Sequence, residues 1–194
     1  ALPTYNEKES IRACIEGFFA TGVVDEVIVC NNNAAPGTSE EIAATAAREV
    51  FESRQGYGWS CRRALAERLE AERRAAHELT IARQVQARLF PQSRPALGSL
   101  DYAGVCFPAH AVGGDYYDFL TLGPDRLGLV IGDVMGKGMA AALLMANLQA
   151  NLRSQVAFAV DTGRLLQSVN HLFCENSPEG AFASLFFADY HDAT

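Results

Sequence analysis

Asp115 and Asp133 have the clearest potential for chemistry in this chain, because each carboxylate follows a glycine where an apolar run meets a Gly-rich turn. Asp115 opens one predicted strand and Asp133 ends the next, so a hairpin through Gly-Pro-Asp would bring both carboxylates to one end of a sheet. Carboxylates are preferred ligands of Mg²⁺ and Mn²⁺, and two such ions can activate a water for attack on a phosphoryl group. Gly-Asp pairs are also ordinary turn residues. The spacing alone leaves both interpretations open.

Glycines and a lysine surround these aspartates. Gly114, Gly136 and Gly138 would let backbone and phosphate approach closely, and Lys137 with the start of the next helix would add positive potential for an anion. The stretch "GDVMGKG" also suggests the nucleotide loop GxxxxGK[ST]. It fails that pattern, because Gly138 stands where Ser or Thr should hold magnesium. We therefore exclude a nucleotide loop here.

The composition of the chain limits the kind of protein it can be. The chain has 194 residues, of which 49% are hydrophobic and 20% charged, and its net charge is −7, so we expect a globular protein without nucleic-acid or membrane partners. The most apolar run, "MAAALLMANLQANLR", is too polar to span a bilayer. The five cysteines show no metal or disulfide spacing, which favours a cytoplasmic location. The four histidines are expected to be structural or solvated.

The first third alternates strand and helix signals. Strands are predicted in "ALPTYNE", "VDEVIVCNNN" and "REVFES", with helices in "EKESIRACIEGFFATG" and "GTSEEIAATAAR". A β-α-β-α-β order implies a parallel sheet with right-handed crossovers. Residues 1–65 are therefore predicted to form a partial Rossmann-like segment.

A long helix should follow. The sequence from Arg62 to Phe90 lacks Gly and Pro and is rich in Ala, Glu, Arg and Leu, and Pro91 should stop it. We assign residues 66–91 as a linker helix. Its Ala-diluted apolar stripe fits a dimerising coiled coil about as well as a solvated helix with Glu/Arg pairs.

The remainder, residues 92–194, is predicted to be an α+β domain, which makes the whole chain a composite of α/β and α+β folds. Strands are expected in "SLDYAGVCFPA", "GDYYDFLTL" and "RLGLVIGDV". Two helices should follow, in "KGMAAALLMANLQANLRSQVAF" and "DTGRLLQSVNHLFCEN", and then a final strand in "AFASLFFADYHDAT".

Three motifs in order, "IARQVQARLFPQ", "VGGDYYDF" and "VIGDVMGKGMAAALLMA", resemble the SpoIIE-like branch of the PPM (protein phosphatase 2C-type) serine/threonine phosphatases. The resemblance covers roughly residues 65–194. It implies a β-sandwich flanked by helices, a two-metal Mn²⁺/Mg²⁺ site, and hydrolysis of phosphoserine or phosphothreonine on a regulatory phosphoprotein. Asp115 matches the family's first metal aspartate, Asp133 the aspartate that bridges both metals, and the Val134 carbonyl an adjacent ligand. The residues from Gly136 to Gly138 match the loop beneath them.

The family completes its site with two later aspartates, which the matched region does not contain. Asp189 and Asp192 fall in what looks like a turn after a strand, and we do not expect them to substitute. Asp118 is a weaker candidate ligand that could simply tie down its strand. We therefore expect a partial PPM-type domain with an incomplete site and without efficient phosphatase activity.

Residues 1–65 resemble a different class, the start of a glycosyltransferase family 2 domain, through "PTYNE", the Asn-rich turn and "RQGYGWSCRRAL". That resemblance implies a nucleotide-sugar donor held by Thr4, Tyr5, Glu7 and Asn32. Asparagine as a turn former explains the same residues equally well. The alternatives to the phosphatase are thus a glycosyltransferase fragment and a non-catalytic module that forms homodimers through the linker helix.

Overall fold

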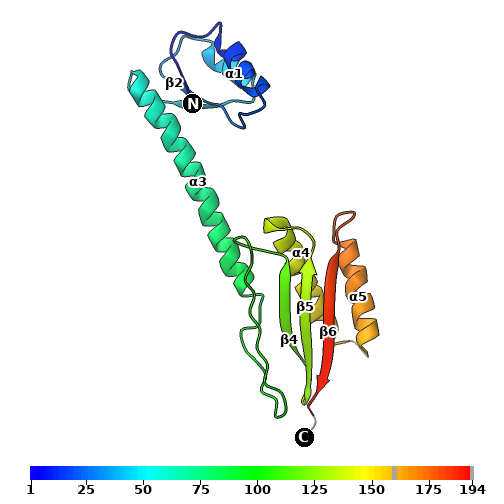
Figure 1. Ribbon diagram of the computed structural model, residues 1–194. Coiled ribbons are helices and arrows are strands. Elements are labelled where there is room, and N and C mark those ends of the chain that lie inside the picture. Colours follow the sequence, from blue (N-terminus) through cyan, green and yellow to red (C-terminus); the bar gives the residue numbers. More distant parts are fainter. Residues whose placement is uncertain (159–160, 193–194) are drawn as a thin grey trace. The chain divides into compact units, whose positions relative to one another are not determined.

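The computed structural model describes residues 1–158 and 161–192. The chain divides into two compact units, residues 1–76 and 77–194, and each unit contains one three-stranded sheet. Figure 1 shows the elements of both units, which make the architecture mixed α/β with two small sheets and several helices. Within the described ranges no helix combines the length and the apolar character needed to cross a membrane.

The first unit has a parallel sheet in the order β1-β2-β3. The predicted order of elements is confirmed: β1 (Leu2–Thr4), α1 (Ile11–Ala20), β2 (Ile28–Asn31), α2 (Thr38–Ala43) and β3 (Arg48–Phe51). Strand β2 is buried along its whole length, as expected of the central strand of a parallel sheet covered on both faces. Ile11, Ile15, Val29 and Ile42 form the core under α1 and α2.

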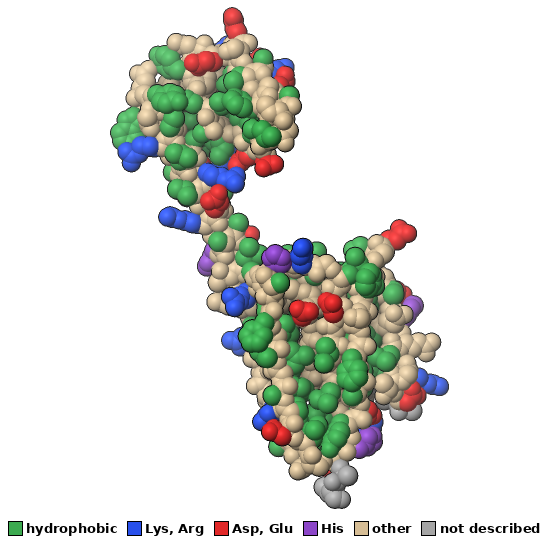
Figure 2. Space-filling model, in the orientation of Figure 1, with side chains coloured by type: hydrophobic (Ala, Val, Ile, Leu, Met, Phe, Trp, Pro, Cys, Tyr) green, Lys and Arg blue, Asp and Glu red, His purple; other side chains and the backbone are tan. Residues whose placement is uncertain are grey.

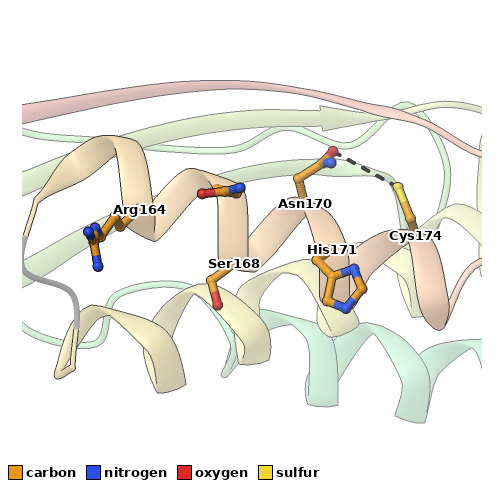
Figure 3. A pocket seen from close by; sticks show the side chains of 6 residues that line it. Arg164, Ser168, Asn170, His171 and Cys174 are labelled. Atoms are coloured by element: carbon orange, nitrogen blue, oxygen red, sulfur yellow. Dashed lines mark hydrogen bonds between the residues drawn. The ribbon is translucent and has the colours of Figure 1, made fainter.

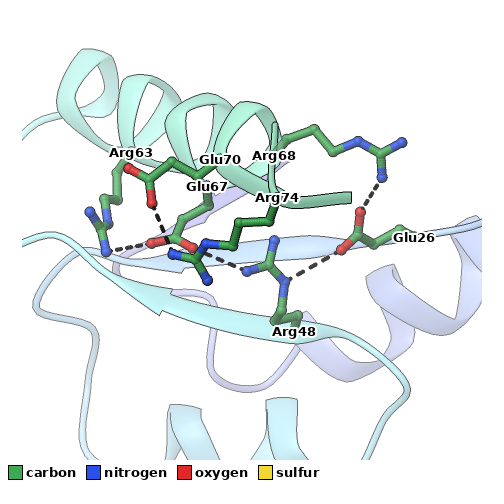
Figure 4. A network of polar contacts seen from close by, with 7 residues as sticks. All are labelled: Glu26, Arg48, Arg63, Glu67, Arg68, Glu70 and Arg74. Carbon is green, nitrogen blue, oxygen red and sulfur yellow. Dashed lines mark hydrogen bonds and ion pairs between the residues drawn. The ribbon is translucent and has the colours of Figure 1, made fainter. Parts of the chain in front are cut away.

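The long helix α3 (Tyr57–Ala87) starts before the predicted Arg62 and stops before Pro91. It starts directly after Gly56, whose φ of +131° is readily adopted only by glycine. In the first unit α3 packs through Ala64. There Glu67 on α3 also forms an ion pair with Arg48 on β3 at 3.2 Å, and Arg48 pairs in turn with Glu26 at 3.4 Å (Figure 4). The predicted domain boundaries remain a prediction.

The second unit has an antiparallel sheet in the order β4-β5-β6, formed by β4 (Asp115–Gly123), β5 (Arg126–Val134) and β6 (Ala183–His191). The predicted hairpin between β4 and β5 is confirmed. The helices α4 (Gly138–Val156) and α5 (Thr162–Glu175) lie on one face of this sheet (Figure 1). The core between them includes Tyr116, Val130, Met145, Leu152 and Phe173.

The opposite sheet face is only partly covered. Phe90 stacks on Tyr117 with ring centroids 5.3 Å apart, and Tyr102 meets Phe119 edge-on at 4.8 Å. The side chains of Ile131 and Phe186 on the same face are 63% and 59% exposed, and Figure 2 shows hydrophobic side chains gathered over this sheet.

The strand predicted in "SLDYAGVCFPA" is wrong, because residues 99–109 form no strand. A Cβ added at Gly104 would lie 2.5 Å from the Tyr117 ring, so this segment passes directly over side chains of the sheet. Its apolar residues cover a sheet face instead of entering the hydrogen-bond ladder.

Candidate metal-binding site

Asp115 at the start of β4 and Asp133 near the end of β5 are direct register partners. Opposed residues of an antiparallel pair have Cα atoms about 4.5–5.5 Å apart and project their side chains to the same face. Both residues are exposed. The hairpin therefore brings the two predicted ligands together at one end of the sheet, on the face away from α4 and α5.

No ion pair within the described residues gives these carboxylates a countercharge. Among the residues that the structure describes, neither takes part in an ion pair or a side-chain hydrogen bond. Like charges placed directly opposite each other on paired strands are destabilising. A cation between them would remove that repulsion, and hard oxygen donors open to water suit Mg²⁺ or Mn²⁺, which keep several water ligands.

The backbone beside the carboxylates is closely packed. A Cβ added at Gly114 would lie 2.4 Å from the Val134 carbonyl oxygen, and the Val134 N–H donates to the Gly114 carbonyl at 3.3 Å. Gly114 is therefore required by this contact between the start of β4 and the end of β5. The same contact places the Val134 carbonyl at this end of the sheet, near the predicted site.

The predicted loop of glycines and lysine joins β5 to α4. Gly136 and Gly138 have φ angles of +93° and +72°, in the region that favours glycine. Lys137 between them is extended, exposed and immediately precedes α4. Because the N-terminus of a helix carries a partial positive charge, this loop combines two sources of attraction for an anion.

The described residues supply few further donors. Ser184 on β6 is the register partner of Asp133 and contributes a hydroxyl at the same end of the sheet. No group of three or more His, Cys, Asp or Glu side chains within residues 1–158 and 161–192 is arranged to hold a metal. Within the described part of the chain, the acidic ligands of this site are therefore the carboxylates of Asp115 and Asp133.

Asp189 and Asp192 lie elsewhere, as expected. Asp189 pairs with Gly128 in the sheet register, and its carboxylate bonds Arg126 at 2.5 Å. It is part of β6, so the predicted turn at this position is wrong: the strand continues to His191. Asp192 accepts hydrogen bonds from the Gly98 and Ser99 backbone at 2.6 and 3.0 Å.

Asp118 ties down its strand and does not face the site. Its carboxylate is fully buried and accepts from the Arg153 guanidinium on α4 through two hydrogen bonds of 2.7 Å. The Tyr116 hydroxyl donates to the same carboxylate at 2.6 Å. Burial and this hydrogen bond raise the pKa of Tyr116, so the phenol stays protonated.

Two further residues of this region, Cys106 and Gln86, were not predicted from the sequence. Burial, and less strongly the charge of Asp115, raise the pKa of the half-buried Cys106 thiol. Gln86 in the last turn of α3 is only 7% exposed and hydrogen-bonds the backbone of Gly113. Gln86 belongs to the motif "IARQVQARLFPQ", but residue types alone do not show its contact with Gly113 or the position of Cys106, because both depend on the fold.

In the first unit, Thr4, Tyr5, Glu7 and Asn32 line one cavity of about 320 Å³. The structure thus brings together the residues predicted for a nucleotide. The Glu7 carboxylate already accepts from the Tyr5 N–H at 2.6 Å and the Thr4 hydroxyl at 3.0 Å. The Tyr5 hydrogen bond is the main cause of the lowered pKa of Glu7.

The Asn32 amide is also occupied. It donates to the carbonyls of Glu52 and Arg54 at 2.7 and 2.9 Å and accepts from the Gly56 N–H at 2.8 Å. These bonds hold the loop that leads from β3 to α3. They favour the interpretation of Asn32 as a turn-forming residue.

A larger cavity of about 670 Å³ lies along α5 and is lined by side chains of that one helix, including Arg164, His171 and Cys174 (Figure 3). His171 is paired with Glu175 of the same helix at 3.3 Å. Most of the lining groups are exposed, and they follow the helix instead of converging from several elements, so this surface does not resemble a catalytic site.

Comparison with known proteins gives the same family as the motifs. Residues 123–194 match the family described as Stage II sporulation protein E (SpoIIE). The match includes Asp133, Val134 and the loop that follows, whereas Asp115 lies upstream of it.

Two relatives match parts of the chain. Phosphoserine phosphatase RsbU of Bacillus subtilis is 28% identical over 114 residues, which are 59% of this chain and 34% of that protein. Protein IcfG of Synechocystis sp. is 46% identical over 61 residues, 31% of this chain and 10% of that protein. The matched parts therefore span about a third of the length of one relative and a tenth of the other.

Among solved structures, the RsbU and RsbW domains of a Mycobacterium tuberculosis protein match with 33% identity and a TM-score of 0.39, over 43% of this chain and 23% of that one. The sequence matches confirm the predicted resemblance of the C-terminal region to SpoIIE-like PPM phosphatases.

Proposed function

We propose that the C-terminal region is part of a metal-dependent protein serine/threonine phosphatase domain of the SpoIIE-like type, with its one three-stranded sheet as part of a PPM β-sandwich. Asp115, Asp133 and the Val134 carbonyl would hold Mn²⁺ or Mg²⁺. The observation that carries the proposal is the direct opposition of two exposed carboxylates, which form no ion pair within the described part of the chain. The SpoIIE match and the similarity to a phosphoserine phosphatase support this class of reaction.

The chemistry requires an activated water and a held phosphate. When bound, the ions lower the pKa of a coordinated water, so that hydroxide is available at neutral pH. The two aspartates would hold them at the open end of the sheet. Lys137 and the N-terminus of α4 would attract the phosphate of a phosphoserine or phosphothreonine, which Gly136 and Gly138 allow to approach the backbone.

We expect this site to be weak in the chain as it stands. Two carboxylates and a carbonyl leave most of the coordination positions of each ion to water. Positioning both metals for attack on a phosphoryl group requires more fixed ligands than these. Inefficient hydrolysis is therefore the expected behaviour of the 194 residues.

The test combines metal binding with hydrolysis. Mn²⁺ titration by calorimetry should give a weak site in the wild type that Asp133→Asn and Asp115→Asn abolish. Asp125→Asn is a matched control, because Asp125 is an exposed aspartate at the tip of the same hairpin. Mn²⁺ binding that survives both site substitutions would refute the site. Rapid, Asp133-dependent hydrolysis of p-nitrophenyl phosphate would instead refute the expected inefficiency.

We further propose that α3 mediates a homodimer. Leu65, Leu69 and Val85 on this helix are 60%, 53% and 60% exposed, and such apolar surface is usually covered in a coiled coil. Analytical ultracentrifugation should detect a dimer that Leu69→Glu weakens, with Glu70→Gln as a control on an exposed neighbouring position. A wild type that stays monomeric at high concentration would contradict this proposal and the non-catalytic dimerising alternative.

A second candidate function concerns the first unit. The shared cavity of Thr4, Tyr5, Glu7 and Asn32 favours a nucleotide-sugar site of the glycosyltransferase kind, although several of their polar groups are bonded internally. Calorimetry with UDP and GDP would test it. Binding that Tyr5→Ala weakens and Phe18→Ala leaves unchanged would support it, because Phe18 is comparably exposed but lies on α1. No binding of either nucleotide would rule the candidate out.

A further inference from the structure

The Gln86 side chain clamps the backbone next to the candidate metal site. Its Nε2 donates to the Gly113 carbonyl at 2.7 Å, and its Oε1 accepts from the Gly113 N–H at 3.1 Å. The two residues are 27 positions apart. One amide side chain in α3 thus satisfies both backbone groups of a single residue in the segment that leads into β4.

The orientation of this amide is determined by its partners. A backbone carbonyl can only accept and an N–H can only donate, so a flipped amide would oppose like groups at both contacts. Gln86 is 7% exposed, and a buried amide or peptide group left without its partner is costly. The contact is therefore a specific lock on the Gly113 peptide groups.

Neighbouring contacts make this lock relevant to the paired carboxylates. Gly113 is two residues from Asp115, and Gly114 between them lies against the Val134 carbonyl beside Asp133. Gln149 on α4 donates to the Leu89 carbonyl at 3.2 Å, which holds the chain just after Gln86. The start of β4 is thus fixed from one side by β5 and from the other by the anchored end of α3.

We propose that Gln86 is a positioning residue that holds Asp115 opposite Asp133 through its amide lock on Gly113. The proposal rests on the phosphatase site proposed above for its link to metal binding. The claim that Gln86 orders the start of β4 rests only on its two hydrogen bonds to Gly113. Partners around a metal site commonly change metal affinity by 10–100-fold when they are removed.

The first measurement needs no metal. Hydrogen exchange in the metal-free chain should show faster exchange at the amides of Gly113, Asp115 and Tyr116 in Gln86→Met, which keeps the side-chain length but removes both hydrogen bonds. Gln86→Glu keeps the acceptor for the Gly113 N–H but sets a carboxylate oxygen against the Gly113 carbonyl, so it should also speed exchange at these amides. Exposed Gln167→Met on α5 is the control and should change nothing at β4. Unchanged exchange at these amides in both Gln86 variants, with the fold retained by circular dichroism, would overturn the proposal.

The second measurement is Mn²⁺ affinity by calorimetry. Gln86→Met should weaken Asp133-dependent binding about tenfold. Equal affinity of wild type and Gln86→Met would overturn the positioning role. If the wild type shows no Asp133-dependent binding, the phosphatase site itself fails. In that case the hydrogen-exchange result still decides whether Gln86 orders the start of β4.

Discussion

Asp115 and Asp133 stand directly opposite each other on β4 and β5, both exposed on one face of the sheet. Their charges repel in the metal-free chain. We therefore predict that Asp133→Asn stabilises the second unit by about 0.5 kcal/mol in the presence of EDTA, as measured by urea denaturation. Saturating Mn²⁺ should reverse the order, because a ligand of the native state stabilises only the chain that binds it.

The control for this reversal is Asp125→Asn, which removes one negative charge from the hairpin without touching the opposed pair. It should leave the response to Mn²⁺ unchanged. If Asp133→Asn destabilised the metal-free chain, the two carboxylates would not repel each other as their register implies.

Gly114 is predicted to be indispensable for the geometry of the site. A Cβ here would lie 2.4 Å from the Val134 carbonyl oxygen, and this is backbone that cannot rotate away. Gly114→Ala should therefore cost about 1–3 kcal/mol of stability and abolish Mn²⁺ binding. The comparison is Gly123→Ala at the other end of β4, where a new Cβ comes no closer than 3.9 Å to Arg126. Equal effects of the two substitutions on unfolding and on Mn²⁺ titration would contradict the prediction.

The buried Asp118 carboxylate should depend on Arg153. The guanidinium donates twice at 2.7 Å, and this interaction raises the pKa of Arg153. Arg153→Met leaves a buried charge without its main partner and is predicted to cost about 2–3 kcal/mol, which allows for the partial exposure of Arg153. The double variant Asp118→Asn/Arg153→Met should recover part of this loss in a double-mutant cycle.

An exposed ion pair provides the reference for that cycle. Arg126 and Asp189 bond at 2.5 Å on neighbouring strands, but the Arg126 side chain is 45% exposed and water screens the pair. Arg126→Met should cost less than about 1 kcal/mol. A similar cost for Arg126→Met and Arg153→Met would show that burial of Asp118 has little influence.

The strands and helices were predictable where side-chain pattern and burial agree. The β-branched run of β2 is buried throughout, and buried residues recur at alternate positions in the first part of β4. The segment containing Tyr102 and Cys106 misled the prediction, because apolar residues that cover a sheet face have the composition of a strand. The start of α3 at Tyr57 depends on the backbone conformation of Gly56, which residue types alone do not fix.

The candidate site was predictable to the extent that it is local. The hairpin turn sets the register of β4 and β5, so the sequence could place Asp115 and Asp133 at one end of a sheet. The Gln86 contact with Gly113 joins positions 27 residues apart and has no local signal. The cavity of the first unit shows the converse: Asn32 suggested a ligand contact, whereas its amide bonds the backbone of the following loop.

Asp192 should make the attachment of the segment around Ser99 depend on pH. Hydrogen bonds from the Ser99 side chain and the Gly98 N–H lower the pKa of Asp192 below its ordinary value. A carboxyl group whose pKa is lower in the folded state stabilises the fold above its unfolded pKa of about 3.9. That stabilisation is lost as the pH falls through the lower, folded pKa.

We therefore predict that the Gly98 and Ser99 amides are protected from hydrogen exchange near pH 6 and progressively lose that protection, relative to other loop amides, below about pH 4. Asp192→Asn should remove this pH dependence, and a wild type whose relative protection is constant down to pH 2 would contradict it.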